Sequence, residues 1–418
     1  MSCRLEIKDL DEKGRGVGED LHVPFTYPGD VAEVQPLNRR KKTGKLLSLI
    51  TRSPDRQVPP CPHFGLCGGC SWQGLKYEAQ LKHKEEKVRA LFGNPLPITP
   101  SDEQFYYRNR MDYAFGAGFS IGLKDGENNI INIEKCLLMS DRSNEITARL
   151  RNFVKTRNLL HHWQGIMRHV VIREGKNIDN VVLNIITSDK GPFPLEELWK
   201  EMKDIVQGIT WSVNLSPADR SYGDIQRCLG QDHFLEKLAG LIFKVPVQSF
   251  FQTNIRQTEK LLSIVKDFAG LTGNEVVLDL YSGTGSIGLS LANQAKQVIG
   301  MEENVPAVEL SISNARLNNI ENYSALAGRV ENILRPSSLA PRPDIVILDP
   351  PRPGLHKKVI AALGELKPQK IIYVSCNPHT QKLDIDGLKG FGYKVDRCQP
   401  LDMFPNTPHI ENVIILTP

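Results

Sequence analysis

The sequence has 418 residues, of which 40% are hydrophobic and 24% charged, as in an ordinary folded protein. This length exceeds what one compact core accommodates, so we expect two or three domains. The N-terminal residues lack the apolar core of a signal peptide and no apolar run is long enough to span a bilayer, which predicts a cytoplasmic, non-membrane protein. A net charge of +4 permits a nucleic-acid partner without demonstrating one.

Residues 1–53 alternate short β-like segments with glycine and proline turns, a pattern typical of a small OB-like β-barrel. This region also contains a basic block without acidic residues. The block is either a solvated loop or a contact for the phosphates of a nucleic acid, and we favour phosphate contact. Its members are Arg39, Arg40, Lys41, Lys42 and, a few residues further on, Lys45.

Eight cysteines in a chain expected to be cytoplasmic argue against a disulfide framework and for metal binding or catalysis. Cys61, Cys67 and Cys70 lie within ten residues, among glycines that let thiolates converge, and Cys136 is a candidate fourth ligand. Four thiolates hold either zinc or an iron–sulfur cluster. Structural zinc usually draws on two C-x-x-C pairs or on histidines, so this spacing favours a [4Fe–4S] cluster.

Residues 54–240 are predicted to form a mixed α+β domain that begins with the cysteine segment. Within it, residues 77–92 have helical spacing, and residues 105–113 interleave aromatic side chains with arginines, which suits either base stacking or an ordinary strand face. From residue 241 to 418, strands and helices alternate as in a doubly wound, Rossmann-like α/β sheet. The predicted domains are therefore 1–53, 54–240 and 241–418.

A glycine-rich turn between a predicted strand and a helix is the first sign of a nucleotide-like ligand. Gly283 and Gly285 follow the apolar strand 276–280 and let the backbone approach such a ligand at the helix N-terminus. Asp279 before the turn would repel a pyrophosphate but suits an ammonium group. Glu302 ends the next strand, where an acid binds ribose hydroxyls. The combination favours S-adenosylmethionine over nicotinamide cofactors.

Three further strand ends carry side chains suited to chemistry. Asp349 follows an apolar strand and is held by two prolines, Cys376 ends the strand 371–375, and Glu411 leads into the last apolar strand. Carboxyl ends of parallel strands meet at the edge of the sheet where ligands bind, so a thiol presented there is a candidate nucleophile. Arg352 after Asp349 disfavours amino-group and cytosine-C5 methyltransferases. We leave His409 out of the mechanism as a loop residue.

With these motifs in place, the chain resembles the RNA uridine-C5 methyltransferase family over nearly its whole length. The resemblance is to the iron–sulfur type with an N-terminal RNA-binding barrel of the TRAM kind. It implies Cys376 as nucleophile, Glu411 as general base, and a cofactor pocket that contains Gln252, Tyr281, Gly283, Gly285, Ser286, Glu302 and Asp349. Many relatives carry a [4Fe–4S] cluster on this cysteine spacing, so the resemblance implies the ligands Cys61, Cys67, Cys70 and Cys136 here.

Two positions depart from the family pattern. Ser286 stands where many relatives have asparagine, which puts its cofactor contact in doubt. Leu383 precedes Asp384 where an Arg-Asp pair is common, which weakens any claim of ion pairing behind the nucleophile. Neither departure affects Cys376 itself.

The resemblance implies methylation of uridine C5 in RNA by a monomer that uses S-adenosylmethionine. A cysteine thiolate adds to C6 of uracil, C5 accepts the methyl group, and a base removes the C5 proton before the thiolate leaves. We therefore expect the site to lower the pKa of Cys376. We favour 23S ribosomal RNA as the target, with uridine 54 of transfer RNA as the alternative.

Two other classes compete with this interpretation. A radical S-adenosylmethionine enzyme typically has three residues between its first two cluster cysteines, whereas five separate Cys61 from Cys67 here. A non-catalytic iron–sulfur RNA-binding protein would not need Asp349, Cys376 and Glu411 together. The sequence therefore favours the polar methyltransferase.

Overall fold

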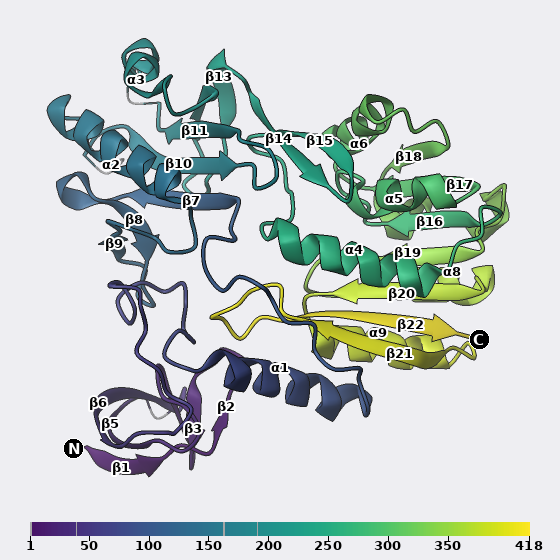
Figure 1. Ribbon diagram of the computed structural model, residues 1–418, viewed down its shortest axis with the longest axis horizontal. Helices are drawn as coiled ribbons and strands as arrows, with labels where there is room; N and C mark the ends of the chain where they lie inside the picture. The colour runs from purple at the N-terminus through teal and green to yellow at the C-terminus, as the bar shows by residue number, and fades with distance from the viewer. Residues whose placement is uncertain (1, 39, 162–163, 190) are drawn as a thin grey trace.

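The computed structural model describes residues 2–38, 40–161, 164–189 and 191–418. Within these ranges the strands form four sheets: a small N-terminal sheet, a central sheet, a two-stranded hairpin and a C-terminal sheet (Figure 1). The predicted α/β fold with several sheets is confirmed. No helix in the ranges described is long and apolar enough to cross a membrane.

The N-terminal sheet is curled. Its strand order is β1-β5-β6-β4-β3-β2, so β1 and β2 lie at opposite edges of six strands although only two residues separate them in the chain. Neighbouring strands lie about 4.8 Å apart, so two such edges can be joined by so short a link only if the sheet bends round. The strands are β1 (Cys3–Glu6), β2 (Asp9–Leu10), β3 (Gly16–Gly18), β4 (Leu21–Val23), β5 (Val31–Asn38) and β6 (Thr43–Thr51).

Residues 40–42 of the predicted basic block lie in the turn between β5 and β6, and Lys45 lies in β6. Arg39 falls outside the described residues. Lys42 Nζ is 3.0 Å from Asp20 Oδ1, and both side chains are exposed. An exposed pair of this kind contributes little to stability, so the turn stays available for other contacts.

The central sheet has the strand order β13-β12-β11-β10-β7-β8-β9 and contains both parallel and antiparallel pairs. Strands β10 and β11 are buried along their whole length, because α2 and α3 contribute to the apolar core that covers them. The elements are β7 (Arg110–Phe115), η1 (Ala117–Phe119), β8 (Ile121–Lys124), β9 (Ile130–Asn132), α2 (Asp141–Thr156), β10 (Met167–Glu174), β11 (Val181–Thr187), α3 (Leu195–Met202), β12 (Gly208–Val213) and β13 (Asp224–Gly230).

A hairpin of β14 (His233–Leu238) and β15 (Leu241–Pro246) follows the central sheet. Its apolar side chains, Phe234 and Phe243 among them, join the core cluster that also contains residues of the C-terminal sheet. The predicted domain limit between residues 240 and 241 falls in the turn of this hairpin. The three-domain division of the chain stays a prediction.

The C-terminal sheet is doubly wound, with the order β18-β17-β16-β19-β20-β22-β21. The strands from β16 to β20 are parallel, and β22 runs antiparallel between β20 and β21. Because β17 and β19 flank β16, the chain reverses its direction of winding there, and ligands bind at such a switch point. The strands are β16 (Val276–Leu280), β17 (Gln297–Glu302), β18 (Tyr323–Ala327), β19 (Ile345–Leu348), β20 (Lys370–Ser375), β21 (Lys394–Leu401) and β22 (Glu411–Thr417).

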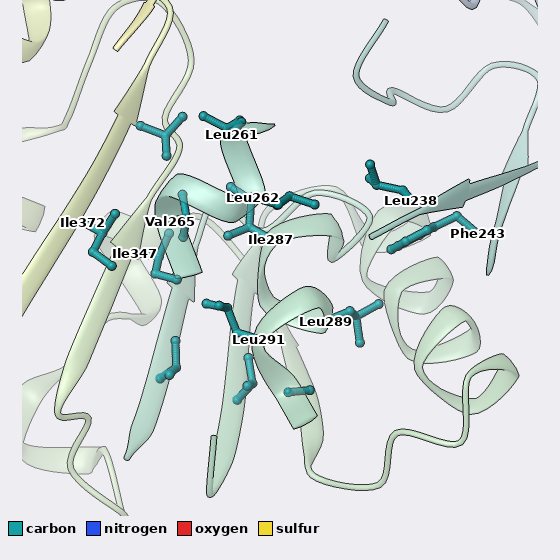
Figure 2. Packing of buried hydrophobic residues seen from close by; sticks show 14 of the residues in the cluster. Leu238, Phe243, Leu261, Leu262, Val265, Ile287, Leu289, Leu291, Ile347 and Ile372 are labelled. Atoms are coloured by element: carbon teal, nitrogen blue, oxygen red, sulfur yellow. The ribbon is translucent and has the colours of Figure 1, made fainter. Parts of the chain in front are cut away.

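Both faces of this sheet are covered. Ile347 and Ile372 face the core formed with α4, α5 and the hairpin (Figure 2). Val346 and Ile371, one residue earlier on each strand, belong to the second core. The alternation explains why these strands read as continuous apolar runs. The helices are α4 (Ile255–Ala269), α5 (Ser286–Leu291), η2 (Ala292–Gln294), α6 (Val305–Leu317), α7 (Val330–Ile333), η3 (Pro336–Ser338), α8 (Lys357–Leu366) and α9 (Pro378–Lys389).

Helix α1 (Tyr77–Phe92) packs against α9 and β21, although it precedes the central sheet in the chain (Figure 1). A buried ion pair fixes this contact: Lys84 Nζ lies 2.6 Å from Asp402 Oδ1, and Tyr77 donates its hydroxyl hydrogen to Asp402 Oδ2 at 2.9 Å. Lys84 also donates to the carbonyl of Phe404. The helix therefore holds the loop that leads from β21 to Glu411.

Replacing Lys84 by methionine should lower the free energy of unfolding by about 3–5 kcal/mol, because Asp402 would keep a buried charge without its partner. Chemical denaturation followed by circular dichroism measures this loss. Lys82→Met, on an exposed part of the same helix, is the matched control and should change stability by no more than about 0.5 kcal/mol. Equal stability of the two variants would contradict the structural role of the pair.

Candidate active site

A cavity of about 1370 Å³ lies at the carboxyl edge of the C-terminal sheet. Strands β16, β17, β19 and β20 end at this edge, and the antiparallel β22 begins there. Except for Asp279 and Gly285, every predicted catalytic and cofactor residue lines the cavity, namely Gln252, Tyr281, Gly283, Ser286, Glu302, Asp349, Cys376 and Glu411. Residues from distant parts of the sequence therefore meet where the switch point of the sheet predicts a site.

The pairing of β20 with β22 sets Cys376 beside Glu411. Ser375, the last residue of β20, pairs with Asn412, so the next position on each strand is Cys376 and Glu411. Gln381 of α9 ties the two strands together: its Nε2 donates to the carbonyls of Tyr373 (2.9 Å) and Asn412 (3.3 Å). The register therefore fixes the thiol and the carboxyl relative to each other.

The loop that carries Asp349 is anchored to α9. Asp384 Oδ2 accepts hydrogen bonds from the hydroxyl of Tyr373 (2.6 Å) and from the backbone N–H of Leu355 (2.8 Å). Asn377 Nδ2 and the hydroxyl of Thr380 both donate to the carbonyl of Arg352. Asp384 thus fixes this loop through two neutral donors. No arginine precedes it, because position 383 is a leucine.

Burial sets the electrostatics of Cys376, the predicted nucleophile. Burial first, and then the negative charges of Glu411 and Asp349, raise the pKa of Cys376 to about 11, while Arg352 opposes them. The expectation that the site lowers the pKa of this thiol is therefore wrong for the RNA-free protein. The physical reason is that the same cavity wall withdraws the thiolate from water and faces it with carboxylates.

Two of the carboxyl groups that line the cavity, those of Asp349 and Glu411, are also hard to ionise. Burial raises the pKa of Asp349 to about 7. Burial likewise raises the pKa of Glu411 well above its usual range, and the charge of Asp349 adds to this while Arg352 acts in the opposite direction. A carboxyl group poised nearer neutrality suits general-base work.

Asp279 holds the glycine-rich turn from behind. Its Oδ2 accepts a hydrogen bond from the backbone N–H of Gly288 (2.9 Å), and the side chain is buried. Asp279 is not one of the described residues that line the cavity. The expectation that this carboxylate faces the ammonium group of a cofactor is therefore corrected to a supporting role.

Glu302 and the glycine-rich turn form one side of the cavity. Glu302 Oε2 accepts from the backbone N–H of Gly283 (3.1 Å), and its Oε1 accepts from that of Asn304 (2.8 Å). Gly283 has φ 53°, and a Cβ there would meet nothing within 4 Å, so this stretch of backbone faces open space. Gly285, with φ 82°, begins α5 and shapes the turn without lining the cavity.

Several residues that line the cavity are not among the predicted site residues. Arg108 belongs to the aromatic and arginine segment whose role was left open, and it lines the cavity with its neighbour Tyr107. Phe404 and His409 lie on the loop before Glu411 and face each other edge-on, with ring centroids 6.3 Å apart. Their only signal was position: His409 stands two residues before a predicted base.

The cysteine segment lies against Cys136. Glu134 donates its backbone N–H to His63 Nε2 (3.2 Å), and Cys67, Cys70 and Cys136 contact the same apolar core. Burial first, with smaller contributions from the other three predicted ligands, raises the pKa of Cys70 to about 12. Within the described residues, no group of three or more His, Cys, Asp or Glu side chains is arranged to hold a metal ion. The geometry therefore does not bear out the predicted cluster.

The thiol of Cys376 should react slowly with iodoacetamide at neutral pH in the RNA-free protein, with a rate that titrates near pH 11. In Glu411→Gln the midpoint should fall, because the thiolate loses a neighbouring negative charge. Mass spectrometry of the peptide that contains Cys376 measures the rate. Asp386→Asn, an exposed change on α9, should leave the midpoint unchanged. A wild-type midpoint at or below about 8.5, the value of a free thiol, would contradict the site described above.

Comparison with known proteins identifies the family. The model of the family described as tRNA (Uracil-5-)-methyltransferase matches residues 76–333 and 341–418. A protein of Nanoarchaeum equitans named as an uncharacterized RNA methyltransferase is 40% identical over 100% of this chain and 93% of its own. The tRNA (uracil(54)-C(5))-methyltransferase of Pyrococcus horikoshii is 38% identical over 97% of this chain and 98% of its own.

A solved structure agrees with this result. The Pyrococcus abyssi tRNA (uracil-54, C5)-methyltransferase, solved in complex with S-adenosyl-L-homocysteine, superposes with a TM-score of 0.86 at 33% identity. The match covers 99% of this chain and 100% of the solved one. The prediction of a uracil-C5 methyltransferase is thereby confirmed at the level of the enzyme class, and the chain belongs to the tRNA (uracil-5-)-methyltransferase family.

Proposed function

We propose that this enzyme transfers a methyl group from S-adenosylmethionine to C5 of a uridine in transfer RNA, through a covalent adduct between Cys376 and C6 of the base. One observation carries the proposal: the β20–β22 register puts a thiol and a buried carboxyl side by side on a cavity that also contains the glycine-rich turn. The S-adenosyl-L-homocysteine in the solved relative supports the choice of cofactor.

The residues around the glycine-rich turn fit S-adenosylmethionine. Each oxygen of Glu302 accepts one backbone hydrogen bond and keeps a further lone pair for a ribose hydroxyl. The open space beside Gly283 admits a ligand against the backbone, and Tyr281 and Ser286 line the same wall. When bound, S-adenosylmethionine supplies an electrophilic methyl group.

Cys376 makes uracil reactive. Its thiolate forms a bond to C6, and the electrons of the C5–C6 double bond move to give an enolate with electron density on C5. The raised pKa of the thiol means that the thiolate forms only when a group in the cavity accepts its proton. Arg352, whose charge opposes the rise, stabilises the anion.

Glu411 acts after C5 has been methylated. Its carboxylate takes the C5 proton, the C5–C6 double bond re-forms, and the bond from C6 to the sulfur of Cys376 breaks. Since burial raises the pKa of Glu411, the carboxylate is a stronger base than an exposed glutamate. This matches the weak acidity of a carbon-bound proton.

The names of the relatives support transfer RNA over ribosomal RNA. The Pyrococcus proteins are named for uridine 54 of transfer RNA, so the alternative target has more support than the favoured ribosomal one. A uridine in folded RNA must leave the base stack to enter the cavity. Arg108 at the cavity and the turn with Arg40 and Lys42 on the curled sheet would contact the surrounding phosphates.

The [4Fe–4S] cluster also stays a proposal. It is supported by the mutual electrostatic influence of the four thiols and by the shared apolar core, which would enclose a cluster. Against it stands the lack of a converged ligand group among the residues described. Nothing in the mechanism above depends on the cluster.

Two variants test the covalent mechanism. Cys376→Ala should form neither 5-methyluridine nor any RNA-linked protein. Glu411→Gln keeps the nucleophile but loses the base, so it should accumulate a methylated, denaturation-resistant RNA adduct, seen as a shifted band on a denaturing gel. Wild type should be trapped in the same way by transfer RNA that contains 5-fluorouridine, because fluorine does not leave as a proton does. Turnover by either variant at the wild-type rate would refute the mechanism.

The substrates of that assay decide the target. Unmodified transfer RNA and fragments of 23S ribosomal RNA are offered separately, and 5-methyluridine is mapped by mass spectrometry. We expect methylation of transfer RNA alone. Methylation confined to the ribosomal fragments would reverse the choice of target and leave the chemistry intact.

Anaerobic purification tests the cluster. A [4Fe–4S] centre requires iron and sulfide at about four each per chain, with visible absorption. Cys67→Ser should lose the metal and lower the unfolding temperature, because metal binding is coupled to folding. Cys228→Ser, outside the cysteine segment, is the matched control and should keep the metal. Colourless protein with stoichiometric zinc would end the proposal.

A further inference from the structure

The reaction proposed above releases one proton per turnover, and the catalytic pair cannot absorb it. A methyl cation equivalent replaces the C5 proton, while the thiol and the carboxyl both return to their starting states. If Glu411 passes its proton to the departing thiolate of Cys376, the thiol must lose it again before the next attack. In either order one proton has to leave a pair of groups that both sit in a poorly hydrated wall.

Two histidines line the cavity among the residues that the structure describes, His356 and His409. His356 Nδ1 accepts the backbone N–H of Lys358 (3.2 Å) and thereby caps α8. His409 caps no helix, because its backbone N–H bonds Thr407 and its ring meets Phe404 edge-on. Nδ1 of His356 is thus used to cap a helix, whereas these contacts of His409 leave its ring nitrogen atoms for other partners.

The chain geometry directs His409 and Glu411 to the same side. Ile410 between them is buried in the core against α8 and α9, whereas the residues before and after it line the cavity. Two residues of extended chain span about 6.6 Å, a gap that one water molecule can bridge between two side chains. Glu411 is buried and His409 is exposed at the cavity mouth, so the pair leads from the interior to solvent.

Burial and nearby positive charges both act on the ring of His409. Packing against Phe404 withdraws the ring partly from water, and four cations approach it: Arg352 from the loop after β19, Lys84 and Lys87 from α1, and Arg108 from the segment before β7. Together they lower the pKa of His409 below its usual value. A neutral imidazole can accept a proton, and a lowered pKa makes it release that proton to water readily.

We propose that His409 is the proton exit of the active site. The O–H bond of protonated Glu411 breaks, an N–H bond forms on the imidazole of His409, and the imidazolium returns its proton to bulk water. This inference rests on the proposed function, since it assumes that Glu411 collects the C5 proton. It assigns a role to a residue that acts through Glu411 and does not touch the reacting base.

Comparison of single-turnover with steady-state kinetics isolates this step. With enzyme in excess over transfer RNA, His409→Ala should methylate within about twofold of the wild-type rate, since methyl transfer to C5 precedes the step in which Glu411 takes up a proton. With RNA in excess, its rate should fall by about 10²-fold, the size of a typical general acid–base contribution. Added imidazole at constant pH should restore at least part of the steady-state rate in a concentration-dependent way.

His233→Ala, a histidine at the start of β14 paired with Asp232, is the control and should match wild type in both assays without response to imidazole. His409→Gln, which preserves a polar side chain, guards against misfolding of the alanine variant and should show the same kinetic split. Equal losses in both assays, an unchanged steady-state rate or failure of imidazole to act would overturn the proton exit. Absence of methylation by wild type would overturn the proposed function as well.

Discussion

The antiparallel pairing of β20 with β22 is the constraint on which the rest of the site depends. Cys376 and Glu411 are separated by 34 residues of chain, including α9 and β21. The strand pairing that ends at Ser375 and Asn412 nevertheless places them opposite each other. A shift of one residue would turn Glu411 to the opposite face of its strand. Buried contacts of Gln381 with both strands oppose such a shift. The chemistry is thus specified by backbone hydrogen bonds.

Burial gives the site its reactivity and its main difficulty together. A cavity wall with little water makes the carboxylate of Glu411 a stronger base, but it also makes the thiolate of Cys376 harder to form. Arg352 is the cation that eases both ionisations. A single exposed guanidinium does not offset the effect of burial, so the pKa values of both groups stay raised.

Local sequence patterns predicted the strand ends and the glycine-rich turn, because apolar runs and glycines determine the conformation of the nearby backbone directly. Properties that depend on residues far away in the chain, such as a pKa or the position of a helix, could not be predicted from local patterns. The thiol pKa depends on Glu411, which arrives from another strand, and the position of α1 depends on Asp402. Asp279 was misjudged for the same reason: the pattern places it before the turn but does not say which face its carboxyl takes.

The loop from Asp402 to Ile410 joins the N-terminal part of the chain to Glu411, the proposed base. Trp72 donates its indole N–H to the carbonyl of Gly14 in the curled sheet, and its backbone N–H to the carbonyl of Asn406 in this loop, each at 3.0 Å. Gln80 of α1 accepts the backbone N–H of Asn406 at 2.8 Å. Because Glu411 directly follows this loop, its position rests on residues more than 300 positions earlier. Hydrogen bonds therefore connect the curled sheet to the C-terminal sheet through the loop that ends just before Glu411.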